Sequence, residues 1–322
     1  MEVLCPAGSP TMAMAAFENG ADAVYVGVSG ATNARNFAGA GFSYHDIEAL
    51  IQYAHQQGKH VHLAVNTFAK PGEEAKWYQA IEQAISFNAD ALILADLGLM
   101  AYARTLSDSV VLHASVQASA TSVAAAKMLY DQFAIERVVL PRVLSVKEIA
   151  RMRKALPSAL GIEVFGFGSL CPMVEGRCYL SGYATGKSPN SYGACSPGKY
   201  VSWQRNGEQT DLRLNGVLLN QLDSNTPAPY PTLCKANYKN GHAICSPESL
   251  STATLIDELR DAGVCSLKIE GRQRGPVYAG KVARFWRDLV DGRCTPNQVD
   301  QQLQKFAEGS QLTQGAYTEG WR

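Results

Sequence analysis

Short apolar runs alternate with helical patterns along most of this chain, and this alternation constrains the fold more than any other feature. The predicted strands are residues 2–5, 23–28, 60–65, 91–94, 110–114, 137–140, 161–165 and 265–269. The predicted helices are residues 9–20, 46–57, 73–87, 98–106, 122–133, 145–156 and 277–289. Most of the strands are continuously apolar, as expected for parallel strands that helices cover. Eight such strands predict an α/β fold, a closed (β/α)8 TIM-like barrel, with a doubly wound open sheet as the alternative.

The alternation breaks in the segment 169–247, which is rich in Gly, Pro, Ser and Asn and shows weak periodicity. A helical pattern returns at residues 248–263. The chain therefore divides into a barrel with seven strands (1–168), an insertion (169–247), a last barrel unit (248–294) and an unassigned polar tail (295–322). An insertion after the seventh strand is expected at the C-terminal face of the barrel, where enzymes of this fold place their chemistry.

Composition excludes several classes of protein. Lys+Arg and Asp+Glu both number 29, so the net charge of zero speaks against a nucleic-acid partner, although a local basic patch stays open. No apolar run approaches the length of a transmembrane helix, and the N-terminus lacks the pattern of a signal peptide. We therefore expect a cytoplasmic protein. The sequence also lacks the glycine-rich nucleotide-binding motifs and the familiar hydrolase motifs.

Four cysteines lie beside turn-forming residues in the insertion: Cys171, Cys178, Cys195 and Cys234. In a reducing compartment such residues are metal ligands or buried thiols more often than disulfides. Four thiolates suit an iron–sulfur cluster or a structural zinc ion. The absence of C-x-x-C pairs favours the cluster, while zinc and four unrelated thiols stay open. We expect Cys265 to be a buried packing residue, and we leave open whether Cys5 packs in the core or lies near the site.

Polar side chains gather where the predicted strands end, and in a barrel these ends converge on one pocket. The candidate binding residues are Arg35, Asn66, Gln117, Arg142, Glu163, Lys268, Glu270 and Arg272. Because Arg is suited to carboxylates and phosphates, the group predicts a site for a small anion. The alternative is that Lys268 pairs with Glu270, and Arg142 with Glu163, to stabilise the mouth of the barrel.

Several motifs resemble the collagenase-like peptidase family, from residue 1 to about residue 290. They are LCPAG (4–8), NGADAVYVG (19–27), ALILAD (91–96), GSLC (168–171) and LKIEGR (267–272). Four further segments resemble the ubiquinone-biosynthesis branch in particular: TNARNFAG (32–39), HASVQASAT (113–121), VVLPRVLS (138–145) and SLCPMVEGRCYLS (169–181).

The resemblance implies a barrel with a 4Fe–4S cluster on the four insertion cysteines. It also implies a heterodimer with a UbiV-like paralogue, and oxygen-independent hydroxylation of the ubiquinone ring with prephenate as oxygen donor. Prephenate is a dicarboxylate, which suits the cationic strand ends. A lipid-carrier protein that presents the quinone precursor is a further expected partner.

Other functions stay open. Related family members hydroxylate RNA bases, and the chain could instead be a non-catalytic electron-transfer or scaffold subunit. Phe167 stands where many members have His, which disfavours a peptidase mechanism.

Overall fold

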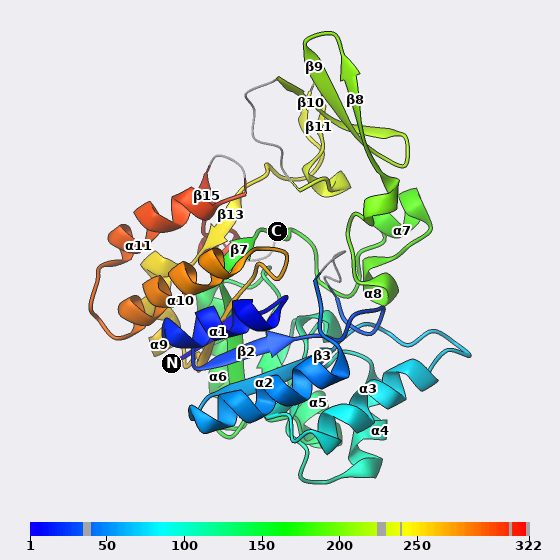
Figure 1. Cartoon of the computed structure of the whole chain (residues 1–322). Helices are drawn as coiled ribbons and strands as arrows, with labels where there is room; N and C mark the ends of the chain where they lie inside the picture. The colour runs from blue at the N-terminus through cyan, green and yellow to red at the C-terminus, as the bar shows by residue number, and fades with distance from the viewer. Residues whose placement is uncertain (35–39, 224–229, 239, 309–310, 320–322) are drawn as a thin grey trace.

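The fold is seen in a computed structural model, which describes residues 1–34, 40–223, 230–238, 240–308 and 311–319 (Figure 1). Eight parallel strands form a closed barrel: β1 (Glu2–Pro6), β2 (Ala23–Val26), β3 (His60–Val65), β4 (Ala91–Leu94), β5 (Leu112–Ala114), β6 (Arg137–Val139), β7 (Gly161–Ser169) and β14 (Ser266–Ile269). Consecutive strands pair side by side, and β14 pairs with both β7 and β1. This closure confirms the TIM-like barrel and excludes the open sheet.

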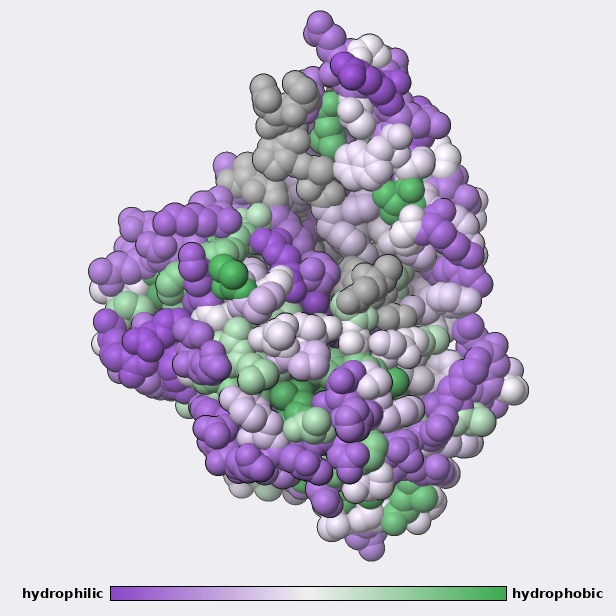
Figure 2. All heavy atoms as spheres, in the orientation of Figure 1, coloured by the Kyte–Doolittle hydropathy of each residue, from purple (hydrophilic) through white to green (hydrophobic). Residues whose placement is uncertain are grey.

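The helices that surround the barrel are α1 (Pro10–Glu18), α2 (Tyr44–Gln56), α3 (Ala75–Ser86), α4 (Leu97–Leu106), α5 (Val123–Phe133), α6 (Val146–Ala155) and α10 (Pro276–Val290). Each lies within two residues of its predicted bounds. Local signals explain this agreement, because Ser43 and Ser145 begin α2 and α6 with capping boxes. Hydrophilic residues cover much of the outer surface, with smaller apolar areas between them (Figure 2).

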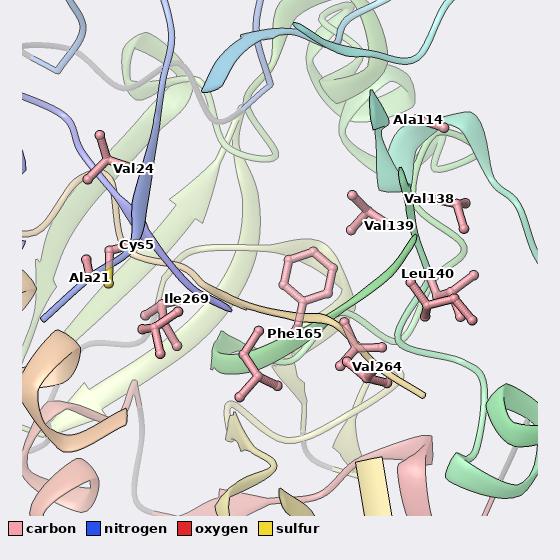
Figure 3. Packing of buried hydrophobic residues seen from close by; sticks show 14 of the residues in the cluster. Cys5, Ala21, Val24, Ala114, Val138, Val139, Leu140, Phe165, Val264 and Ile269 are labelled. Carbon is pink, nitrogen blue, oxygen red and sulfur yellow. The ribbon is translucent and has the colours of Figure 1, made fainter. Parts of the chain in front are cut away.

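The core lies between the strands and these helices, where Trp77 and Trp286 are among the largest fully buried side chains. Cys5 is buried in the same cluster, next to residues of the neighbouring strands such as Val24 and Ile269 (Figure 3). Burial raises the pKa of the Cys5 thiol, which suits a packing residue. The prediction for Cys265 is wrong, because this residue precedes β14 and is exposed.

The insertion contains a small antiparallel sheet that the sequence analysis did not predict: β8 (Val201–Asn206), β9 (Gln209–Leu214) and β10 (Val217–Asp223). It extends away from the barrel (Figure 1) and has its own apolar cluster around Leu212, Leu214 and Leu219. Two short helices, α7 (Leu180–Thr185) and α8 (Pro189–Tyr192), and a hairpin of β11 (Asn237–Tyr238) and β12 (Gly241–His242) complete the segment.

The helix predicted over residues 248–263 is wrong in its first part. Residues Ser249–Ser251 form β13, which pairs antiparallel with the end of β7, and only Ile256–Asp261 form an α-helix, α9. The physical reason is that β7 extends four residues beyond its predicted end and offers its edge to a partner strand. A pairing between segments so distant in sequence overrides the local helical pattern.

The C-terminal tail is structured. It contains α11 (Pro296–Leu303), the short 3-10 helix η5 (Gln304–Phe306), β15 (Leu312–Thr313) and α12 (Ala316–Glu319). The tail reaches the barrel, because β15 pairs with β13 and the backbone N–H of Phe165 donates to the Tyr317 hydroxyl at 3.2 Å. Among the described residues, none of the helices combines the length and the apolarity needed to cross a lipid bilayer.

Candidate functional site

A pocket at the C-terminal ends of the barrel strands encloses about 530 Å³, part of it open to solvent. We call it the mouth pocket. Six of the predicted binding residues line it: Asn66, Gln117, Arg142, Lys268, Glu270 and Arg272. Arg35 lies outside the described residues. Glu163 is fully buried in the barrel interior and is not part of this lining. The strand ends therefore converge much as the barrel fold requires.

Two further residues of the mouth pocket were missed by the sequence analysis. Tyr25 lies in the apolar run of β2, where its periodicity suggests only core packing. Its ring faces two cations, because Lys268 Nζ lies 4.3 Å and the Arg272 guanidinium carbon 5.7 Å from the ring centroid. Glu175 comes from the cysteine-rich loop, and its only sequence signal is its position between Cys171 and Cys178.

The predicted ion pairs have the wrong partners. Lys268 Nζ contacts Glu163 at 2.9 Å, and Arg142 Nη1 contacts Glu270 at 2.5 Å. The different depths of Glu163 and Glu270 in the barrel explain why the two cations have other partners than predicted. Glu163 sits opposite Ser266 in the register of β7 and β14, deep enough for the Lys268 ammonium to fold back onto it. Glu270 follows the end of β14 and can therefore meet Arg142, which follows the end of β6.

Arg142 is almost fully buried at the edge of the mouth pocket, with only 2% of its surface exposed. Its Nε donates to Glu175 at 2.8 Å, its Nη1 to the Ser169 carbonyl at 2.7 Å, and its Nη1 and Nη2 to Glu270. The guanidinium carbon also lies 3.8 Å from the Phe165 ring centroid. These contacts give Arg142 the role of joining three loops, since its donors already have protein acceptors.

Glu175 shares its guanidinium partner with Glu270, so two carboxylates compete for one positive charge. Burial raises the pKa of Glu175, although the charge of Arg142 opposes this effect. Its Oε2 atom accepts no hydrogen bond from the described residues. Glu175 can therefore hold a proton more readily than an exposed carboxyl group.

The four predicted cysteine ligands line a second hollow of about 610 Å³, part of it open to solvent. We call it the thiol hollow. Cys171 follows β7, Cys178 precedes α7, Cys195 follows α8, and Cys234 lies in the 3-10 helix η3 (Leu233–Lys235). Apolar side chains also line the hollow, namely Met173, Leu180, Pro189 and Leu233, together with polar ones such as Ser181, Asn190 and Thr232. The structure thus brings the thiols of four separate loop positions to one space.

Two glycines hold the cysteine loops tightly against the barrel. Gly176 and Gly193 have φ of 88° and 81°, in the region that favours glycine. A Cβ atom at Gly176 would lie 2.0 Å from the Gln117 carbonyl oxygen, and one at Gly193 would lie 2.4 Å from that of Asn33. The close approach fixes where Cys178 and Cys195 enter the hollow.

The donor set of the thiol hollow is compatible with an iron–sulfur cluster, in which each iron atom takes a thiolate. All eight cysteines are described, and none forms a disulfide. In the ranges that the structure describes, no three His, Cys, Asp or Glu side chains are grouped closely enough to hold one metal ion. Cys245 donates its backbone N–H to the Cys234 carbonyl at 3.1 Å but does not line the hollow.

The thiol hollow and the mouth pocket are neighbours. Ala34, Gln117 and Glu175 line both spaces. A group bound among the cysteines would therefore share these three residues with a ligand in the barrel mouth. This adjacency is the arrangement expected of a cofactor beside a substrate pocket.

Comparison with known proteins identifies the family. Residues 8–321 match the profile of peptidase family U32. The chain is 29% identical to the tRNA hydroxylation protein P of Haemophilus influenzae, over 99% of this chain and 73% of the relative, and 29% identical to that of Escherichia coli, over 99% and 74%. It is 30% identical to the 23S rRNA 5-hydroxycytidine C2501 synthase of Escherichia coli, over 90% of this chain and 39% of the relative.

Among solved structures, a U32 peptidase matches 52% of this chain and 70% of its own length, with a TM-score of 0.42 and 16% identity. The predicted family is confirmed, whereas its ubiquinone-biosynthesis branch stays a prediction, because the relatives named above carry RNA hydroxylation names. The family profile matches nearly the whole chain, residues 8–321, so this protein belongs to peptidase family U32.

Proposed function

We propose that this chain is the iron–sulfur subunit of a hydroxylase that adds a hydroxyl group to a planar ring. One observation carries the proposal: a hollow lined by four cysteines directly borders a pocket of cations and aromatic side chains at the mouth of the barrel. The names of the relatives support hydroxylation, since they are tRNA and rRNA hydroxylation proteins.

Cys171, Cys178, Cys195 and Cys234 would hold a 4Fe–4S cluster, which supplies one-electron chemistry when bound. The apolar side chains in the wall of the thiol hollow, such as Met173, Leu180 and Leu233, would shield part of the cluster from water. Glu175, on the border with the mouth pocket, would hold a proton next to the bound ligand. Arg142 would keep the cysteine loop and the loop after β14 in register through its pairs with Glu175 and Glu270.

The mouth pocket would bind the oxygen donor, for which a prephenate-like dicarboxylate is our candidate. Arg272 brings positive charge to this space, where its Nη1 donates to the Asn33 amide oxygen at 2.8 Å, and Lys268, which is paired with Glu163, adds an ammonium to the lining. The Tyr25 ring lies against both cations and keeps them near the pocket. Carboxylates are the natural ligands of such a group.

An RNA base is the first candidate for the ring, because the relatives named above are RNA hydroxylation proteins. The ring of a ubiquinone precursor is the second candidate. Two observations favour it: the motifs at residues 32–39 and 169–181, which resemble the ubiquinone-biosynthesis branch, and the net charge of zero. The UbiV-like paralogue and a lipid-carrier protein belong to this second candidate as proposed partners.

Peptidase activity, which the family name suggests, has less support. Phe167 occupies the position of a family histidine and is buried, paired in register with Ser251 of β13. The described lining of the mouth pocket contains neither histidine nor cysteine. A nucleophile with an imidazole base is therefore not available there.

The test is complementation of a deletion strain grown without oxygen. The wild-type chain and Cys265→Ser, an exposed thiol outside the hollow, should restore the missing product, while Cys171→Ser and Cys195→Ser should not. Mass spectrometry of total RNA and of extracted quinones tells the two candidates apart by which product is lost. Unchanged RNA and quinones in the deletion strain, or full rescue by the Cys171 and Cys195 variants, would refute the proposal.

A further inference from the structure

We infer that a third hollow, beside the mouth pocket, binds the planar ring that is to be hydroxylated, and that Glu308 accepts a hydrogen bond from that ring. The inference rests on the proposed function and says where the ring substrate of that function would bind. This aromatic pocket encloses about 570 Å³, part of it open to solvent. Its aromatic lining is Tyr25, Phe167, Tyr230, Tyr278 and Phe306, and its charged lining is Glu270, Arg272, Arg274 and Glu308.

The aromatic pocket adjoins the mouth pocket, because Tyr25, Glu270 and Arg272 line both. A hydroxylase needs room for an oxygen donor and for a ring that accepts the oxygen. The mouth pocket offers the cations that a dicarboxylate requires, and the aromatic pocket offers the ring faces that a planar substrate requires. Two ligands could thus meet across three shared side chains.

The walls of the aromatic pocket are held in place before any ligand binds. The rings of Phe167 and Tyr278 stack with centroids 6.4 Å apart, and Phe306 packs edge-on against Tyr278 at 5.7 Å. The Tyr278 hydroxyl donates to the Glu270 carbonyl at 2.5 Å. Gly271 has a φ of 132°, and a Cβ atom there would lie 2.5 Å from the Tyr278 ring. Glycine therefore lets the ring lie directly on the loop after β14.

The charged side chains of this pocket are not all joined in ion pairs with one another. Glu270 is paired with Arg142, while Arg274 lies with its guanidinium carbon 4.9 Å from the Tyr278 ring centroid and donates to the Phe306 carbonyl at 3.2 Å. An arginine stacked on an aromatic ring presents a flat, positively charged surface to a ligand. A purely apolar ligand would displace solvent from that charge without offering it an acceptor of its own.

Glu308 offers a hydrogen-bond acceptor for a donor group on the ring. Its Oε1 atom accepts from Gln273 Nε2 at 3.3 Å, while its buried Oε2 atom accepts no hydrogen bond from any described residue. Its backbone is fixed, since Ser249 Oγ accepts from the Glu308 N–H at 2.6 Å. A buried carboxylate oxygen without a donor is costly, and a ligand N–H or O–H group would remove that cost. The pocket therefore fits a planar ring that carries a hydrogen-bond donor.

The experiment measures binding of two pairs of probes to the full-length chain, purified without oxygen, by ligand-observed NMR titration. Cytidine and phenol carry a ring donor, whereas N4,N4-dimethylcytidine and anisole are the matched probes without it. We expect at least one donor probe to bind roughly 10-fold tighter than its methylated counterpart, the size expected for a hydrogen bond to a charged group. Preference for cytidine points to an RNA base, and preference for phenol points to a quinone precursor.

Variants locate the binding site. Glu308→Ala should abolish the preference for the donor probe, and Phe306→Ala should weaken both members of the pair. Glu258→Ala on α9 and Tyr183→Ala on α7, both exposed, are the matched controls and should bind as the wild type does. Absence of binding by any probe, equal affinity within both pairs, or unchanged affinities in the Glu308 and Phe306 variants would overturn the inference. Because the titration needs no turnover, hydroxylation in the complementation test can still succeed when this inference fails.

Discussion

Replacing Glu163 by Gln removes one negative charge from a fully buried ionic network inside the barrel. The Glu163 carboxylate accepts from Lys268 Nζ at 2.9 Å, from Arg137 Nη1 at 3.0 Å and from Ser266 Oγ at 3.1 Å. Glutamine keeps the size of the side chain but leaves the ammonium of Lys268 without a counter-charge. We therefore expect a folded variant with clearly lower stability.

Two estimates of the loss agree. Burial alone would raise the pKa of Glu163, but the charges of Lys268 and Arg137 outweigh burial and lower the pKa from 4.5 to about 2. That difference corresponds to about 3 kcal/mol of stability at neutral pH. Removing one partner of a buried ion pair costs about 3–5 kcal/mol in other proteins. For a chain of 322 residues, a loss of about 3 kcal/mol lowers the melting temperature by about 4–5 °C.

The assay is urea unfolding of wild type, Glu163→Gln and the exposed control Glu258→Gln, at about pH 7 and about pH 3.5. Because the pKa of Glu163 is lowered in the folded state, its stabilisation is present above the unfolded pKa and is lost as the pH falls through the folded value. The difference between wild type and Glu163→Gln should therefore shrink at the lower pH. A loss below about 1 kcal/mol at neutral pH, or a difference that grows on acidification, would refute the reasoning.

Three further predictions follow from the site and its helices. Burial raises the pKa of Glu175, so the folded state keeps a proton that the unfolded state releases, and stability falls as the pH rises above the unfolded value. In urea titrations, the free energy of unfolding of Glu175→Gln should therefore rise relative to that of wild type between about pH 5 and about pH 8. Glu270→Gln is the comparison variant and should be less stable than wild type at both of these pH values. Arg142→Lys should bind less iron after anaerobic purification, because an ammonium cannot make the forked contact to Glu270 and reach Glu175 as well; unchanged iron content would contradict this role. Ser145→Ala should lower the free energy of unfolding by about 1 kcal/mol through loss of the α6 capping box, and no change would contradict it.

The barrel could be predicted from the sequence because its determinants are local. Continuous apolar runs, capping residues and stop glycines place each strand and helix within a few residues of its observed bounds. The sheet of the insertion was missed because its strands, although six or seven residues long, mix polar with apolar residues and are half exposed. One signal was present: the turn between β9 and β10 is Asn215–Gly216, and both residues have positive φ. β13 had no local signal, because its three residues are held in place by pairing with the distant strands β7 and β15.

The site was predictable in position and less so in detail. Residues such as Asn66 and Gln117 could be placed in one pocket because parallel strand ends converge in a barrel. The partners of Arg142 and Lys268 could not, because the depth of each side chain depends on strand register. Tyr25 was missed for a related reason: an aromatic residue within an apolar strand has the same pattern whether it faces the core or the pocket.

The most direct test is quantification of iron and acid-labile sulfide in the anaerobically purified chain, together with an EPR spectrum of the reduced protein. We expect about four iron and about four sulfide per chain, as in a 4Fe–4S cluster. Cys178→Ser and Cys234→Ser should lose this content, while Cys265→Ser retains it. A folded wild-type protein that contains zinc, or no metal, at this site would contradict the proposed cofactor.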